Sequence, residues 1–153
     1  MKKYLFTFLL ALIVGFFLSS FFINQYDNYS GIKVSGLGED LYFIQYGVYS
    51  SLDSMEKETI GLENYVYNIN EDMYYVYVGI TNIDTNANKI VDYYKNLGYE
   101  TIIKRYSVSN NKFIEELINY DNLLKETNDK TAIASLINQI LIKYEEVVIN
   151  GKD

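Results

Sequence analysis

An uncharged apolar segment near the start of the chain constrains the fold most, because it divides the chain into two parts that need different surroundings. The segment "YLFTFLLALIVGFFLSSFFI" runs from Tyr4 to Ile23 without a charged residue. As a helix, a run of this length spans about 30 Å, which matches the hydrocarbon thickness of a bilayer. The sequence therefore predicts that residues 1–23 form a short cytoplasmic end and one transmembrane helix.

The residues around this segment predict the side of the membrane on which the rest of the chain lies. Lys2 and Lys3 precede the apolar run, and basic residues next to a span stay in the cytoplasm. We therefore expect a single-pass cell-membrane protein with an extracytoplasmic C-terminal domain. A cleaved signal peptide is the alternative, since Ser19 and Ser20 are small. The long apolar run and the lack of an A-x-A pattern favour an uncleaved anchor.

Several residue types that carry chemistry are missing from the chain. Its 153 residues include no Cys, His, Pro or Trp. This excludes disulfides, thiol nucleophiles, Ser-His-Asp triads and zinc sites of the usual nitrogen and sulfur type. We expect no metal site and no cofactor. The length suffices for an anchor and one small domain.

The charge of the chain excludes one class of partner. After the first 26 residues, which hold two lysines and no acid, 11 basic and 20 acidic residues remain, a net charge of −9. Nucleic acids and anionic lipid surfaces attract Lys- and Arg-rich patches and repel acidic domains. We therefore expect no nucleic-acid partner.

Beyond a polar, glycine-containing linker at residues 24–40, turn and capping signals separate alternating elements. Ser50 with Asp53, and Thr81 with Asp84, form capping-box patterns that start two helices. Gly98 is suited to end the second helix. The expected strands are residues 41–49, 65–69, 73–80 and 99–107, with a hairpin turn at residues 70–72.

The order of these elements predicts an α+β domain over residues 41–107. A β-α-β-β-α-β succession is typical of a ferredoxin-like fold, with four antiparallel strands and both helices on one face. The other face of the sheet is then open. Residues 108–153 predict a C-terminal extension of two amphipathic helices, broken by "KETNDK" at residues 125–130. These helices either pack on the domain, which we favour, or bind another protein.

Three stretches carry a resemblance to a known family. The segments "YFIQYGVYSS", "MYYVYVGI" and "NLGYETIIKR" follow one another in this order between residues 41 and 105. Together they resemble the SPOR domain, the sporulation-related repeat of bacterial envelope proteins. The resemblance implies a module that binds peptidoglycan glycan strands stripped of their stem peptides at division or sporulation septa. It also implies a membrane-anchored layout like the one predicted above.

Strand alternation selects the residues of this expected glycan site. Tyr42, Ile44 and Tyr46 share one face of the first strand and suit the core. The opposite face combines phenol rings for stacking on sugar with an amide for its hydroxyl groups. The predicted glycan-binding residues are Phe43, Gln45, Met73, Tyr75 and Tyr77. Met73 and Tyr75 stand where members of the family carry tryptophan and arginine, and Val48 where many carry a small polar residue.

Two other functions are compatible with the sequence. The first is an envelope scaffold that binds a divisome or other envelope protein through its acidic domain and C-terminal helices, without glycan. The second is a glycan hydrolase that uses paired carboxylates such as Glu115/Glu116 or Glu145/Glu146. These pairs lie on the predicted solvated faces of helices, so we expect no catalytic residue. The sequence does not distinguish a role in vegetative division from one in sporulation.

Overall fold

The computed structural model describes residues 38–151, which form a four-stranded sheet with helices on both of its faces. The elements are β1 (Glu39–Tyr49), α2 (Leu52–Thr59), β2 (Val66–Asn70), β3 (Met73–Thr81), α3 (Asp84–Asn96), β4 (Ile102–Val108), α4 (Asn111–Glu126), α5 (Lys130–Tyr144) and the π-helical turn η1 (Glu145–Ile149). The predicted anchor and most of the predicted linker lie outside the described residues. Within those residues, no helix combines the length and apolar character needed to span a bilayer.

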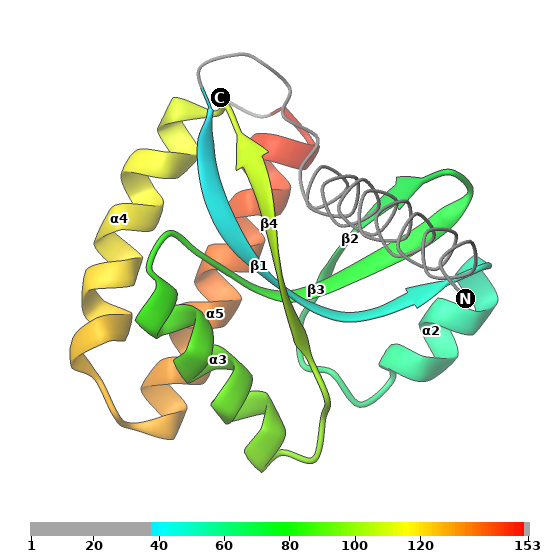
Figure 1. Cartoon of the computed structure of the whole chain (residues 1–153), viewed down its shortest axis with the longest axis horizontal. Coiled ribbons are helices and arrows are strands. Elements are labelled where there is room, and N and C mark those ends of the chain that lie inside the picture. Colours follow the sequence, from blue (N-terminus) through cyan, green and yellow to red (C-terminus); the bar gives the residue numbers. More distant parts are fainter. Residues whose placement is uncertain (1–37, 152–153) are drawn as a thin grey trace, which may run out of the picture. The chain divides into compact units, whose positions relative to one another are not determined.

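The sheet is antiparallel throughout and has the strand order β2-β3-β1-β4 (Figure 1). The long central strand β1 pairs with β3 on one side and with β4 on the other. This confirms the predicted α+β class and the four-stranded antiparallel sheet. The fourth strand starts at Ile102 rather than at Tyr99, so residues 99–101 precede it.

Two irregularities in the β1–β3 pairing decide where the side chains of these strands point. The register shifts between Ile44 and Gln45 and again before Gly47. An extra residue at such a bulge re-aims the side chains that follow it. Gln45 consequently faces Tyr77 across the strands. A Cβ atom at Gly47 would collide with the ring of Tyr49, so glycine leaves space for this ring.

The helix starts differ from the predicted capping boxes. Helix α2 is capped by Ser51 rather than Ser50, and the Ser51 hydroxyl accepts a hydrogen bond from the N–H of Ser54 at 3.2 Å. The predicted cap at Thr81 is wrong, since α3 starts after Ile83 without a side-chain cap. Thr81 instead accepts from the N–H of Ile83 at 3.1 Å and donates to a buried carboxylate described below.

The predicted hairpin between β2 and β3 is confirmed, with a two-residue turn. Glu71 and Asp72 have φ angles of +49° and +59°, and Asn70 pairs with Met73 around them. Positive φ at both central residues is the mark of a type I′ turn, whose twist matches that of the flanking strands. Neither residue is glycine, so both adopt a backbone conformation that side chains disfavour.

The two predicted tail helices are confirmed, and they pack on the domain. On one face of the sheet, Ile90 of α3 lies where a side chain at Gly79 would be, next to Ile44. On the opposite face, the ring of Tyr144 in α5 lies 5.5 Å from that of Phe43. One hydrophobic core therefore joins the sheet, α3 and the C-terminal helices; its C-terminal members include Phe113, Leu117, Leu124, Ile137, Ile140 and Leu141.

Candidate functional site

Three of the five predicted glycan-binding residues are not accessible. Phe43 is 2% exposed, Gln45 7% and Tyr77 6%. A sugar ring cannot stack on an aromatic ring that other side chains already cover. The expectation that this face of the sheet is open is therefore wrong for its central part.

An aromatic cluster explains this burial. The ring of Phe43 lies edge-on to Tyr77 at 5.2 Å and to Tyr106 at 5.3 Å. Tyr144 of α5 completes the contacts and lies 5.2 Å from Phe113 of α4. Edge-to-face pairs at these distances stabilise a core beyond their area burial. The C-terminal helices thus use the predicted glycan surface as their own packing surface.

The remaining two predicted residues, Met73 and Tyr75, are half-buried, and Tyr75 packs against the hydrophobic core. Tyr75 pairs with Val48 of β1 and with Asn68 of β2, while Met73 lies beside the hairpin turn. They share the β2–β3 end of the sheet. Since Gln45 and Tyr77 are buried, Met73 and Tyr75 do not complete the five-residue site that alternation predicted.

A buried carboxylate in α4 ties the C-terminal helices to the loop after β3. Asp121 is almost fully buried and accepts hydrogen bonds from the N–H of Asn82 at 2.7 Å, from Asn86 Nδ2 at 3.0 Å and from the Thr81 hydroxyl. Burial raises the pKa of the Asp121 carboxyl, and the three hydrogen bonds oppose this rise. The group satisfies donors from two elements, so it fixes α4 against the start of α3.

A lysine of α3 makes a second contact with α4, at the C-terminal end of that helix. The ammonium group of Lys89 in α3 donates to the carbonyl oxygens of Leu124 at 2.8 Å, Lys125 at 3.0 Å and Thr127 at 2.8 Å. The last carbonyls of a helix have no partner within the helix, and a cation there also interacts favourably with the helix dipole. The pairing holds the end of α4 on α3.

Asp121 and Thr81 are the residues in the described part of the chain that most resemble a catalytic pair, since a carboxylate contacts a hydroxyl. Both are buried, with exposures of 1% and 0%. A substrate would have to enter the core to reach them. Their geometry therefore suits a structural clamp and not a nucleophile with its base.

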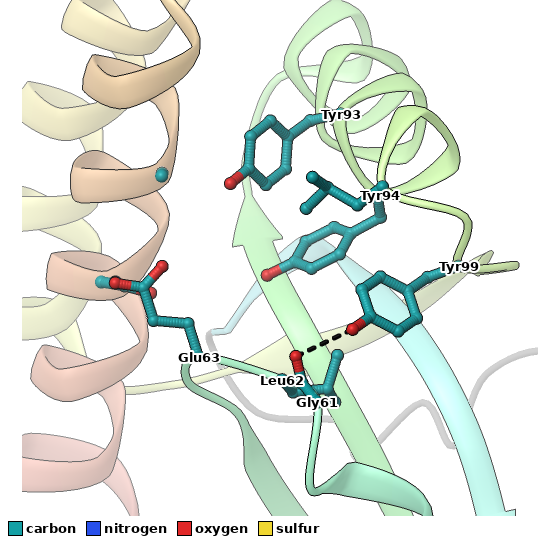
Figure 2. Close-up of a pocket in the computed structure, with 9 residues that line it drawn as sticks. Gly61, Leu62, Glu63, Tyr93, Tyr94 and Tyr99 are labelled. Carbon is teal, nitrogen blue, oxygen red and sulfur yellow. Dashed lines mark hydrogen bonds between the residues drawn. The ribbon is translucent and has the colours of Figure 1, made fainter.

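A tyrosine-lined cleft lies between α3, α5 and the loop after α2. We call it the tyrosine cleft. It has a volume of about 310 Å³ and is lined by Gly61, Leu62, Glu63, Tyr93, Tyr94, Leu97, Tyr99, Ala134 and Asn138. Figure 2 shows the hydroxyl groups of Tyr93 and Tyr94 pointing into the cleft. The hydroxyl group of Tyr99 donates a hydrogen bond of 2.8 Å to the carbonyl oxygen of Gly61. A shallower hollow beside it shares Glu63, Tyr93 and Asn138 and adds Thr131, Ser135 and Gln139.

The tyrosine cleft offers phenol rings, one amide and one carboxylate to a ligand. Burial raises the pKa of the Tyr93 hydroxyl, and the negative charge of Glu63 adds to this effect. Burial also raises the pKa of Tyr94. Both phenols therefore stay protonated and act as hydrogen-bond donors at neutral pH. The size falls at the lower end of ligand pockets, which span about 300–1,000 Å³.

Sequence reasoning missed the tyrosine cleft and the Asp121 clamp for one physical reason. The residues of each come from segments far apart in the chain, and tertiary packing brings them together. In the sequence, the position of Asp121 could have indicated the clamp. It is an acid on the apolar stripe of an amphipathic helix, between Leu117 and Leu124, and such a position predicts a buried, satisfied charge.

Comparison of the chain with models of known protein families, with characterised proteins and with solved structures gives no match.

Proposed function

We propose that the protein is a single-pass membrane protein of a bacterial cell envelope whose extracytoplasmic domain binds another protein and catalyses no reaction. The apolar segment of residues 4–23 and the preceding lysines support the anchor and its orientation. The β-α-β-β-α-β order and the three motif segments support a domain of SPOR type. That likeness supports a place at division or sporulation septa.

One observation carries the preference for a protein partner. The face that bears Phe43, Gln45 and Tyr77 is filled by α4 and α5, so the surface expected to hold a glycan strand is occupied. The outer faces of the C-terminal helices instead expose large apolar side chains, namely Ile118, Leu123 and Ile142. These side chains are available for apolar contacts with another protein.

The test compares the protein extracted in mild detergent from the bacterium that encodes it with the same full-length protein from an unrelated host. We expect a larger particle from the native membrane by analytical ultracentrifugation. This larger particle should persist after muramidase digestion, which cuts glycan strands but leaves proteins intact. Equal particle sizes from the two hosts, or collapse of the native particle under muramidase, would contradict a protein partner.

Glycan binding through the tyrosine cleft is the second candidate, and the lining of that cleft favours it. Tyr93 offers a ring face, and Asn138 and Glu63 offer the polar groups that sugar hydroxyls require. The measurement is retention of the full-length protein by cell-wall sacculi with and without amidase treatment. Higher retention by amidase-treated sacculi that is lost in Tyr93→Ala but kept in Tyr67→Ala would establish this function. Equal retention by both preparations would exclude it.

A further inference from the structure

The two edges of the sheet differ in a way that concerns protein binding. Among the described residues, β2 pairs only with β3 and β4 only with β1. Sheet edges carry unpaired N–H and C=O groups, and natural proteins protect them with charged side chains, proline or bulges. Edge strand β4 carries exposed Lys104 and Arg105. Edge strand β2, with the sequence "VYNIN", carries no charge and no proline.

Large apolar side chains stand exposed along this unprotected edge. Tyr67 is 41% exposed and Ile69 is 54% exposed, and as residues i and i+2 of one strand they point to the same face. The Tyr67 ring lies 6.0 Å from that of Tyr74 on the neighbouring strand. A strand that paired with β2 would place its own side chains beside Tyr67 and Ile69 and so enlarge this apolar surface.

A groove follows the same edge. It has a volume of about 560 Å³ and is lined by Tyr65, Val66, Tyr67, Asn68, Ile69, Glu145, Ile149 and Asn150. One wall is therefore β2 and the other is the π-helical turn η1. Ile149 provides an exposed apolar surface on the η1 wall, so a segment laid along β2 would contact apolar side chains from both walls.

The charge around the groove selects the chemistry of its occupant. Glu145 is the charged residue of the lining, which includes no Lys or Arg. Glu71 and Asp72 follow at the turn that ends β2. A second copy that paired through its own β2 would bring the same acidic residues to this edge and meet like charge, whereas a basic segment meets opposite charge.

We propose that β2 is a docking edge that binds an extended, basic segment of another protein as a fifth strand of the sheet. Backbone hydrogen bonds to β2 supply affinity, and alternate apolar side chains of the segment contact Tyr67 and Ile69 on one face of the sheet. Basic side chains of the segment face Glu145 and the β2–β3 turn. This inference rests on the proposed protein-binding function and names the surface that performs it.

The first test uses the full-length protein in detergent micelles and a labelled peptide, Lys-Val-Lys-Ile-Lys-Val, as probe. Fluorescence anisotropy should show saturable binding that weakens at least about tenfold in Ile69→Lys, since a charge then stands on the edge. Ile102→Lys is the matched control, because Ile102 is similarly exposed at 52% but lies on the other edge strand, β4. A peptide with proline in place of isoleucine should not bind, since proline cannot complete the backbone ladder.

Several outcomes would overturn the proposal, and the first three come from the peptide measurement. They are absence of saturable binding, equal binding by wild type and Ile69→Lys, and equal binding of the proline peptide, which would indicate charge attraction alone. Dimerisation of the wild type that Ile69→Lys abolishes would also overturn it, since the occupant would then be a second copy. If the native complex described above forms and Ile69→Lys leaves it intact, the docking edge is wrong while the proposed function stands. Absence of any native complex contradicts the proposed function itself.

Discussion

The carboxylate of Asp121 in α4 accepts a hydrogen bond of 2.7 Å from the backbone N–H of Asn82, which lies 39 residues earlier in the chain at the end of β3. This hydrogen bond joins α4 to the end of β3, and it forms only when the Asp121 carboxylate is buried. Because the Thr81 hydroxyl and the Asn86 amide also donate to this carboxylate, loss of Asp121 leaves several buried donors without an acceptor.

Asp121→Asn should lower the free energy of unfolding by about 1–3 kcal/mol, since an amide leaves at least one of the buried donors unsatisfied. The effect should depend on pH. Burial raises the pKa of Asp121 above its ordinary value of 3.8, so the folded protein keeps this proton to higher pH than the unfolded chain. The contribution of Asp121 to stability therefore falls as pH rises from 3.8 through the raised value.

The difference between wild type and Asp121→Asn should consequently be largest at low pH and shrink as pH rises. Urea unfolding of both proteins between about pH 3.5 and 7 measures this difference. A difference that stays constant would contradict the raised pKa, and one that grows with pH would show that the three hydrogen bonds outweigh burial and lower the pKa of Asp121.

Phe43→Ala should lower the free energy of unfolding by about 3–5 kcal/mol, because it opens a cavity among Tyr77, Tyr106 and Tyr144. Tyr67→Ala, which removes an exposed ring of the edge strand, is the control and should cost no more than about 1 kcal/mol. Denaturant unfolding measures both. A small effect at Phe43 would mean that the C-terminal helices do not cover this face in solution and would reopen the sheet as a glycan surface.

Asp72→Gly should raise the free energy of unfolding by about 0.4–1 kcal/mol, since glycine adopts positive φ without the strain that Asp72 carries at +59°. The paired control is Asp92→Gly, an exposed position within α3. There, glycine should lower stability by about 1 kcal/mol. Thermal unfolding of the two variants should shift in opposite directions; a shift to lower temperature in both would contradict the type I′ turn.

Gly79→Ala should destabilise the protein by about 1–3 kcal/mol, because its Cβ would lie 2.8 Å from Ile90 Cγ2. Ile90→Ala removes that obstacle. The double variant should therefore lose less stability than the sum of the single variants, by about 0.5 kcal/mol or more. Gly98→Ala provides the comparison, since it has a φ of +89° and no neighbour within 4 Å. Its cost should simply add to that of Ile90→Ala.

The regular elements could be predicted from the sequence because their signals are local. Helical spacing in residues 111–126 and 130–144, and the β2–β3 hairpin, each follow from neighbours within a few positions. Helix starts were less accurate, since Ser50 and Ser51 are equivalent in sequence and tertiary contacts decide which one caps α2. At Thr81 the competing partner was Asp121, which no local pattern reveals.

The sheet-face site failed for a different reason. Alternation correctly placed Gln45 and Tyr77 together, but it gives only the face of a strand and not what covers that face. Both a bound sugar and a packed helix select aromatic residues there. Here α4 and α5 cover the face, because contacts of Asp121 and Lys89 between α4 and the β3–α3 segment fix the orientation of these helices.

The packing of the C-terminal helices on β1 also bears on synthesis of the chain. Phe43 is synthesised before the residues that cover it, which include Phe113, Tyr144 and Val147. A nascent chain that ends before α5 has the strands of the sheet but an apolar surface exposed to water, a state prone to aggregation. Synthesis of α4 and α5 is thus a requirement for a stable fold, and a chain truncated after residue 107 should accumulate as protease-sensitive or aggregated material.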